Sequence, residues 1–498
     1  MIEVEVHSFL RDFLRQHGDR NWPHHLTMAR LVARALRLGR PALMQTNSSV
    51  GKYCLSYLMP VLVGDWSVIV VAPTAVQQYL LETEIPLLQK WLATDKQIRA
   101  GDRWKDTDDL LLTTPESWLR DRLNREGRFP DSTPVIIDRA HDIVEITQKI
   151  LTISLNVSDW EELRQKASPY AELIRNSRAK LTKEIFAHPR NPYESYILDE
   201  SESAILDYLC RTLAAQKLLT RKFSLFWQQW QQDKILWTSR DLELGLFSIS
   251  LAPIQVKKNL APIWQQQPFV IVGDFLDLEP TAPIYRQQLG LPDLLSLKFS
   301  PNRQNEHIQL YLPNRFPMHN TPQFAKAFIE QTRMLASLSQ NSAKSVIILV
   351  ENVPLQAQVG SVLAAEFGSR VKVEKLPTKP NAIIVCSWSF WQSHQLQLPA
   401  PQLLIVATIP LPSPENPLVA SRVAYYKKTR QDWFSLYFLP TALKTMQQAI
   451  VPLRESQGVV ALLDNRVKFR SYGKTILSAL EPYARSNYID PSWFGYGK

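Results

Sequence analysis

The sequence is short of glycine, cysteine and long apolar runs. Glycine accounts for 15 of 498 residues, against a usual share of about 7%, and this scarcity argues against intact glycine-rich loops. Cys54, Cys210 and Cys386 lie far apart, so they cannot form a CxxC metal site or hold an iron–sulfur cluster. No apolar run approaches the roughly 18 residues of a membrane span. The first residues also lack a signal-peptide pattern, so we expect a cytoplasmic protein without membrane contact.

The charge of the chain is unevenly distributed. The formal net charge is +10, and most of the excess Lys and Arg lies in residues 265–498. A basic C-terminal half favours an anionic partner, with nucleic acid preferred over a membrane surface. The alternative is an ordinary basic surface that serves solubility. Composition therefore leaves nucleic acid as the first candidate partner.

Short apolar strands alternate with helical stretches along much of the chain. Segments such as 68–72 and 134–138 are Val/Ile-rich and each leads into a helical pattern, which is typical of a parallel α/β sheet. Residues 145–265 instead show long amphipathic helical spacing, and the alternation resumes near residue 266. We therefore predict an α/β protein with two parallel-sheet lobes, residues 1–144 and 266–498. An all-α subdomain, residues 145–265, is inserted between them.

Residues 46–53 look like an altered phosphate-binding loop. The working pattern is G-x-x-x-x-G-K-[ST] between a strand and a helix, in which Lys reaches the phosphates and the hydroxyl holds Mg²⁺. Gly51 and Lys52 keep their places in this pattern, whereas Thr46 stands for its first Gly and Tyr53 for its Ser or Thr. The phenol of Tyr53 is too far from the backbone to hold Mg²⁺ as that hydroxyl does.

A second altered motif follows the strand at 135–137. The sequence Asp138-Arg-Ala-His141 looks like an acid box of the type D-E-A-H. The glutamate that positions or deprotonates the attacking water has become Arg139, a fixed cation. Asp138 keeps a Mg²⁺-ligand position, and Arg139 would oppose Mg²⁺ binding nearby. The simpler interpretation is that Arg139 pairs with a neighbouring carboxylate.

The order of these and later segments resembles the DinG/XPD-like branch of the superfamily 2 DNA helicases over nearly the whole chain. The resemblance implies two RecA-like lobes, an arch-like insert and a nucleotide between the lobes. It assigns remnants of the nucleotide site to Thr46, Gly51, Lys52, Tyr53, Asp138, His141 and Arg454. In the second-lobe arginine segment Arg454 is kept, while Val451 replaces the first arginine. No residue is predicted to be catalytic. We also expect neither the iron–sulfur domain of some relatives nor a preceding nuclease domain.

The same resemblance indicates residues that contact nucleic acid. Thr74 lies in a segment that contacts the DNA backbone in the family, with a plain helix cap as the alternative. Phe390 and Trp391 are kept from the family's S-F-W-E-G-x-D segment. Two basic-aromatic stretches have the composition of a single-strand track, in which cations neutralise phosphates and aromatics stack on bases. Their basic residues are Lys427, Lys428, Arg430, Arg466, Lys468 and Arg470. The alternative for these stretches is a solvated surface.

These observations predict a catalytically degenerate helicase-like protein. It would bind single-stranded DNA or act as a regulatory subunit with a protein partner in DNA processing or repair, in the cytoplasm or at the nucleoid. No cofactor is expected, and Asp138 would hold a metal only if Mg-ATP binds. Lys52 is predicted to have a structural role, as an ion-pair partner of Asp138. The alternatives are a slow ATP-dependent helicase and a protein-interaction scaffold without a nucleic-acid role.

Overall fold

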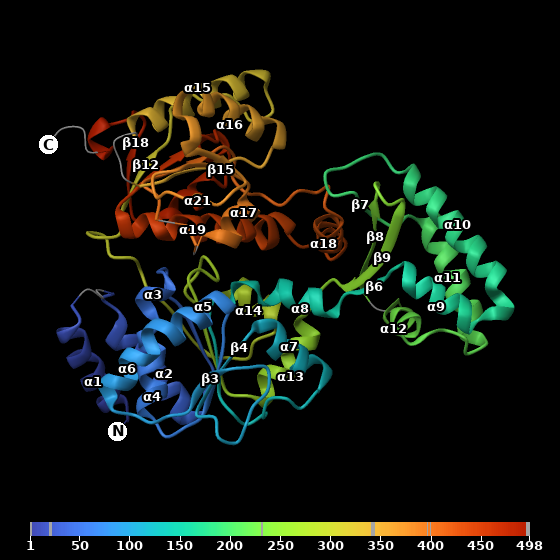
Figure 1. Cartoon of the computed structure of the whole chain (residues 1–498), viewed down its shortest axis with the longest axis horizontal. Helices are drawn as coiled ribbons and strands as arrows, with labels where there is room; N and C mark the ends of the chain where they lie inside the picture. Colours follow the sequence, from blue (N-terminus) through green and yellow to red (C-terminus); the bar gives the residue numbers. More distant parts are fainter. Residues whose placement is uncertain are drawn as a thin grey trace.

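The computed structural model describes residues 2–18, 22–230, 233–339, 344–395, 397–398 and 400–494. Figure 1 shows two sheet-containing lobes, one above the other, and a third unit to their side. In the described ranges, no helix combines the length and the apolar character needed to cross a membrane.

The first lobe is built on a parallel sheet with strand order β11-β1-β10-β5-β2-β4-β3. Its central strands are short Val/Ile/Leu runs that are buried on both faces, as parallel sheets covered by helices require. The strands are β1 (Ala42–Gln45), β2 (Val68–Val71), β3 (Ile98–Ala100), β4 (Leu110–Thr113), β5 (Val135–Ile137), β10 (Phe269–Gly273) and β11 (Leu295–Lys298). The helices are α1 (Ile2–Gln16), α2 (His25–Leu38), α3 (Val50–Tyr53), α4 (Leu55–Val63), α5 (Thr74–Tyr79), α6 (Ile85–Leu92), α7 (Pro115–Asn124), α8 (Ile143–Leu151), α13 (Lys257–Gln266) and α14 (Pro283–Leu289).

The expected start of the second lobe at residue 266 is wrong. Strand β10 lies between β1 and β5, with Val270 opposite both Ala42 and Ile136, and β11 pairs with β1. The chain therefore returns from the insert to complete the first sheet. The reason is geometric, because a strand's sheet is set by its pairing partners and the apolar sequence of β10 would suit either lobe.

The insert is not all-α, as the sequence predicted. It holds an antiparallel sheet of order β6-β9-β8-β7 among the described residues. Strands β8 and β9 form a hairpin in which Asp241 faces Leu246, and Gly245 in the connecting turn has φ of 64°. The strands are β6 (Ile153–Leu155), β7 (Ser195–Ile197), β8 (Lys234–Asp241) and β9 (Leu246–Pro253), and the helices are α9 (Val157–Lys166), α10 (Ala171–Ala187), α11 (Glu200–Ala215) and α12 (Arg221–Trp230).

The second lobe carries a parallel sheet of order β14-β15-β13-β16-β17-β12-β18. Its strands are β12 (Ile308–Tyr311), β13 (Val346–Leu349), β14 (Val371–Val373), β15 (Ile383–Cys386), β16 (Leu403–Val406), β17 (Val459–Leu462) and β18 (Tyr483–Ser486). The helices are α15 (Pro322–Leu338), α16 (Val353–Phe367), α17 (Trp388–His394), α18 (Pro417–Lys428), α19 (Leu439–Ser456), α20 (Arg466–Phe469) and α21 (Gly473–Leu480). Helix α18 packs against β7 and β8, so the second lobe contacts the insert. Two parallel-sheet lobes with an insert are therefore confirmed.

A buried arginine holds the insert together. Arg240 on β8 donates to Glu194, to the Tyr196 hydroxyl at 2.7 Å and to the carbonyl of His188 at 2.8 Å. Its guanidinium also reaches the carbonyls of Ile185 and Phe186. One side chain thereby ties α10 and the segment after it to the sheet.

We expect Arg240→Met to loosen the insert, because several buried acceptors lose their donor. Amide hydrogen exchange over residues 153–253 should become at least about tenfold faster. The matched control is Arg211→Met, which removes an exposed one-turn pair with Asp207 and should change exchange by less than about twofold. Equal behaviour of the two variants would contradict this role for Arg240.

Candidate functional site

The altered phosphate-binding loop lies at the carboxyl end of β1 and is fastened to the end of β10. The backbone N–H of Thr46 donates to the Gly273 carbonyl at 2.8 Å, and the N–H of Asn47 donates to the Asp274 carbonyl at 2.8 Å. Gly51 follows in α3, where an added Cβ would come within 3.3 Å of the Tyr79 hydroxyl. Thr46 is buried and its hydroxyl donates to the Gly273 carbonyl at 3.2 Å. The loop is thus held by its own lobe.

Asp138 is fully buried and its two carboxylate oxygens are each bound by a tyrosine. The Tyr53 hydroxyl donates to Oδ1 at 2.6 Å, and the Tyr57 hydroxyl donates to Oδ2 at 2.7 Å. The N–H of Arg139 adds a third bond to Oδ1, at 2.8 Å. Burial raises the pKa of Asp138, while these donors and the Arg139 charge lower it. Burial also raises the pKa of both tyrosines well above its ordinary value, with the Asp138 charge adding to the effect, so both phenols stay protonated donors.

The predicted pair between Lys52 and Asp138 is wrong. Lys52 Nζ instead lies 3.0 Å from Oε1 of Glu306, a buried residue on the segment that joins the two lobes. The other Glu306 oxygen accepts the N–H of Asn302 at 2.7 Å. Asp138 was the acid that the motifs offered as a partner for Lys52, but its oxygens accept hydrogen bonds from Tyr53 and Tyr57. The loop also reaches the second lobe, where the Ser49 hydroxyl donates to Glu455 on α19.

Arg139 takes a left-handed backbone conformation, with φ of 53°, directly after β5. Its side chain lines a small cavity between the lobes. The other lining residues are Ser48, Ser49, Tyr53, Asp274, Gln395, Gln448, Val451 and Pro452. In the described part of the chain, no carboxylate lies within ion-pair distance of the Arg139 guanidinium, so the expected pair is not formed. Its charge acts at longer range and lowers the pKa of Asp138 and Asp274.

His141 lies between two carboxylates. Its Nε2 is 3.2 Å from Asp142, and its Nδ1 is 3.4 Å from Asp274 at the end of β10. Burial alone lowers the pKa of His141, but the two carboxylates raise it more, to about 9. The imidazolium in turn lowers the pKa of Asp142 and Asp274 against the effect of burial. The protonated ring therefore joins the acid box to β10.

Of the two arginine positions in the second lobe, one faces the cavity and the other does not. Val451 lines the cavity, where it presents an aliphatic group. Arg454 is buried, and its guanidinium donates to the carbonyls of Leu480 at 2.7 Å and Glu481 at 3.0 Å. Two further carbonyls accept from it, those of Glu306 and Pro482. Burial lowers the pKa of Arg454 to about 10. The structure therefore places Arg454 as a bridge between segments, and its predicted contact with a nucleotide stays a prediction.

Three predicted nucleic-acid contacts also interact within the fold. Trp391 is buried in the second-lobe core, because its helix turns that face toward the sheet. Phe390 is half-buried and stacks on His394, with ring centroids 4.3 Å apart. Arg466 forms a two-pronged pair with Asp464, whose Oδ2 lies 2.6 Å from its Nη2. Trp391 and Arg466 are thus structural, a distinction that residue type alone does not reveal.

The remaining predicted contacts are on the surface. Thr74 is exposed as the first residue of α5, and Pro73 occupies the cap position, so Thr74 is not the plain cap. Lys427, Lys428 and Arg430 are exposed at the carboxyl end of α18. Lys468 and Arg470 are exposed at the end of α20, where the Lys468 ammonium donates to Asn314. The cationic end of α18 is therefore available to a partner.

Sequence reasoning missed three residues that shape the candidate nucleotide site. Tyr57 lies one helical turn after Tyr53, and this spacing could have indicated that both phenols share a face. Glu306 and Glu455 belong to no motif and reach the loop only through the packing of the lobes. Each of the three supplies a hydrogen-bond partner at a position where the family pattern expects metal or phosphate.

We expect Tyr57→Phe to destabilise the first lobe, because a buried charged acceptor loses one of its donors. The loss should be about 1.5–3 kcal/mol, measured from the thermal transition of this lobe. Tyr208→Phe removes an exposed hydroxyl and is the matched control, expected within about 0.5 kcal/mol of the parent. A Tyr57→Phe protein as stable as the control would show that Asp138 does not depend on the phenol.

The His141 pair predicts a pH dependence of stability. Because the folded pKa is raised from 6.5 to about 9, its contribution is fully present below about pH 6.5 and is lost as the pH rises toward 9. Asp142 is half exposed, so solvent screens the pair and we expect a loss of about 1–2 kcal/mol. Unfolding free energies of the parent and His141→Gln should differ at pH 6 and converge by pH 9.5. Parallel pH curves for the two proteins would contradict this assignment.

Comparison with known proteins agrees with this arrangement. The family profile described as helicase C-terminal domain matches residues 318–483. The chain is 21% identical over 474 residues to the ATP-dependent DNA helicase YoaA of Escherichia coli, covering 84% of this chain and 73% of that protein. It is 24% identical over 332 residues to the 3'-5' exonuclease DinG of Bacillus subtilis, covering 60% of this chain but 34% of that protein.

Solved structures show the same fold. An Xpd4 structure from S. tokodaii superimposes with a TM-score of 0.60 at 14% identity, covering 93% of this chain and 100% of that one. A second XPD structure, without ligand by its name, gives 0.58 at 13% identity, with 92% and 100% covered. The solved structures show the shared two-lobe fold, and the matched C-terminal domain and the YoaA and DinG similarity support the resemblance of this chain to the DinG/XPD-like superfamily 2 helicases.

Proposed function

We propose that this protein is a helicase-like binder of single-stranded nucleic acid, with DNA favoured, and that it does not turn over ATP. It would serve as a binding or regulatory subunit in a DNA-processing assembly. One observation carries the proposal: the protein's own side chains take the places where Mg²⁺ and phosphates would have to bind. Tyr53 and Tyr57 donate to both oxygens of Asp138, and Glu306 pairs with Lys52.

The residues present do not fit Mg²⁺. Mg²⁺ prefers several oxygen ligands in a near-octahedral arrangement, whereas both oxygens of Asp138 already accept from phenols and Tyr53 replaces the Ser or Thr hydroxyl. The neighbouring fixed charge is the cation Arg139, which would repel a second cation. At Asp138, Mg²⁺ would have to compete with the charge-assisted hydrogen bonds of Tyr53 and Tyr57 on a buried carboxylate.

The residues for phosphate chemistry are also missing. Phosphoryl transfer depends on a group that orients the attacking water and on cations that neutralise the γ-phosphate, each worth orders of magnitude in rate. Arg139 stands where the water-orienting glutamate is expected, and Val451 stands at an arginine position. Arg454 is a cation of the motif by residue type, but its guanidinium donates to the backbone carbonyls of Leu480 and Glu481. These substitutions support binding without hydrolysis.

Support for the nucleic-acid role comes from the relatives and from the exposed cations. The matched YoaA proteins are described as ATP-dependent DNA helicases. In this chain Lys427, Lys428 and Arg430 extend from the end of α18 into solvent, beside Tyr425. Such a combination of cations and aromatic rings suits an unpaired strand, whose phosphates and bases it can contact together.

The test measures hydrolysis and binding on the same protein. With Mg-ATP and an oligo-dT of about 15 nucleotides, a length within the usual site sizes of such binders, we expect no phosphate release above the Lys52→Ala background. Fluorescence anisotropy should show binding of the oligonucleotide that weakens steeply with salt. Added Mg-ATP should leave this affinity unchanged, because we expect no ATP-dependent movement of the two lobes.

The other outcomes distinguish the alternatives. Phosphate release that the strand stimulates and Lys52→Ala abolishes would mean that the protein is a slow helicase. Absent or salt-insensitive strand binding, together with no hydrolysis, would favour a protein-interaction scaffold. The charge-reversed variant Lys428→Glu is the control for the binding arm. It should weaken the strand without altering phosphate release.

A further inference from the structure

A surface groove between α1 and α2 of the first lobe has an apolar floor. Its volume is about 670 Å³. Val4, Leu31 and Leu38 form the apolar part of its lining, and Val4 and Leu38 are well exposed to solvent. An adjoining cavity of about 200 Å³ shares Leu31 and Leu38 and continues the groove to the exposed Leu295 of β11. A contiguous exposed apolar surface of this kind is typical of a docking site.

Arginines border this groove, and two of them have no acidic partner. Arg30, Arg34 and Arg37 recur at intervals of four and three residues along α2, so they lie on one face of this helix. Glu3, an acid in the lining, is neutralised by Arg37, whose Nη2 lies 2.6 Å from its Oε1. In the part of the chain that the structure describes, no carboxylate lies within ion-pair distance of Arg30 or Arg34. The groove therefore presents two uncompensated cations beside apolar side chains.

A partner for this groove must present acids next to apolar side chains. Guanidinium groups bind carboxylates and phosphates alike, so charge alone does not choose between a protein and a nucleic acid. A phosphate backbone would leave the apolar floor in contact with water, whereas a peptide with leucines beside acids would cover it. The groove therefore favours an acidic protein segment that carries leucines.

The tip of the β8–β9 hairpin in the insert is a segment of this kind. Residues 241–246, Asp-Leu-Glu-Leu-Gly-Leu, are all exposed, and the exposed fraction reaches 69% at Leu244. Oδ1 of Asp241 accepts the backbone N–H groups of Glu243 and Leu244, each at 2.9 Å, so the turn is fixed before it meets a partner. The Glu243 carboxylate forms no ion pair with any described residue. The tip thus offers acids and leucines in a pre-organised turn, which lowers the entropy cost of binding.

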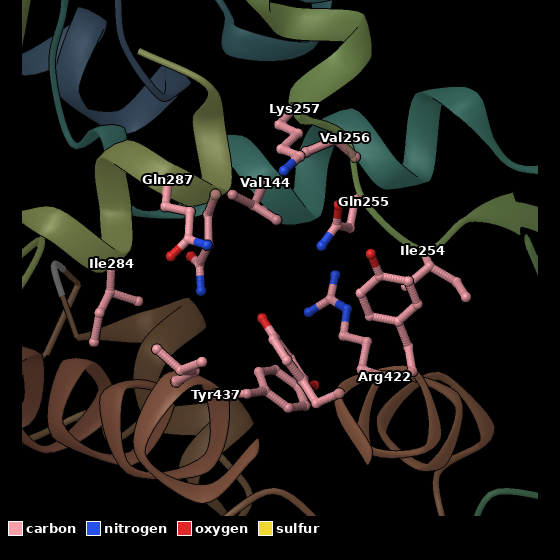
Figure 2. Close-up of a pocket in the computed structure, with 13 residues that line it drawn as sticks. Val144, Ile254, Gln255, Val256, Lys257, Ile284, Gln287, Arg422 and Tyr437 are labelled. Carbon is pink, nitrogen blue, oxygen red and sulfur yellow. The ribbon is translucent and has the colours of Figure 1, made fainter. Parts of the chain in front are cut away.

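The groove and the hairpin lie at opposite ends of the molecule. Figure 1 shows α1 and α2 at one end of the first lobe, whereas β8 and β9 belong to the insert beyond its other end. The insert is fixed at its base, because α18 contacts β7 and β8, and Nη2 of Arg422 on α18 donates to Gln148 of α8 at 2.5 Å. Figure 2 shows Arg422 extending from its helix toward Gln255, with the Tyr437 ring centroid 5.2 Å from its Cζ. The hairpin is therefore held away from the groove of its own chain.

We propose that the hairpin tip of one copy of this chain docks into the α1–α2 groove of a second copy. Leu244 covers the apolar floor, and Glu243 faces Arg30 and Arg34. Because two different surfaces meet, the contact is head-to-tail, and each copy keeps a groove or a tip for a further copy. The small extent of both surfaces predicts a weak, reversible contact. The proposal does not rest on the proposed function, since neither surface belongs to the candidate nucleotide site or to the cationic end of α18.

The first experiment measures self-association of the full chain by sedimentation velocity, up to about 100 μM because weak contacts have micromolar affinities. The parent should sediment faster as its concentration rises. Arg34→Glu reverses a charge of the groove and Glu243→Arg reverses one of the tip, and both positions are exposed, so both variants should fold. Each should associate at least about tenfold more weakly than the parent. Lys379→Glu, at an exposed position of the second lobe, is the matched control and should associate like the parent.

The second experiment locates the contact. Leu244→Cys places a thiol on the tip and Leu38→Cys places one in the groove, while the three native cysteines are buried. After the two variants are mixed and mildly oxidised, mass spectrometry should find a disulfide between positions 244 and 38. Its yield should exceed that of Leu376→Cys mixed with Leu38→Cys, the exposed control pair, at least about fivefold.

Three results would overturn the proposal. They are a parent that stays monomeric up to about 100 μM, self-association that neither charge reversal weakens, and cross-linking at position 244 no stronger than in the control pair. Neither experiment contains ATP or nucleic acid, so failure here is separable from failure of the proposed function.

Discussion

The buried carboxylate of Asp138 is the constraint around which the candidate nucleotide site is organised. A carboxylate removed from water must be hydrogen-bonded or neutralised, and here two phenols and one backbone N–H meet that need. Because Tyr53 lies within the altered phosphate-binding loop, the same bonds fix the loop against β5. The interaction that stabilises the lobe thus also places a donor on each oxygen of this carboxylate.

Contacts between the lobes extend this arrangement. Lys52 pairs with Glu306 on the connecting segment, and Ser49 donates to Glu455 on α19. Farther along the interface, Lys444 of the second lobe lies 3.3 Å from both Asp142 and Glu145 of the first. In a working motor the nucleotide bridges the lobes. In this chain protein side chains supply the bridges, which is consistent with a binder whose lobes need no ATP to meet.

The basic residues of the second lobe illustrate how one residue type takes two roles. Arg454 and Arg466 are buried or half-buried and are used by backbone carbonyls and Asp464. Lys427 and Arg430 are exposed at a helix end. Arg422 is intermediate, since its Nη2 donates to Gln148 and its guanidinium lies over the Tyr437 ring. Exposure and hydrogen-bond partners, which residue type does not give, separate these roles.

The sequence by itself determined the α/β class, the order of the motifs and the substitutions Tyr53 and Arg139, because local patterns and residue chemistry carry that information. Tertiary structure decided the rest. Strand β10 joined the first sheet through pairing with β1 and β5, and the β8–β9 hairpin made the insert partly a sheet. Lys52 pairs with Glu306, which is distant in the sequence, because folding brings the connecting segment next to the loop. Such partners depend on long-range packing, which no local pattern encodes.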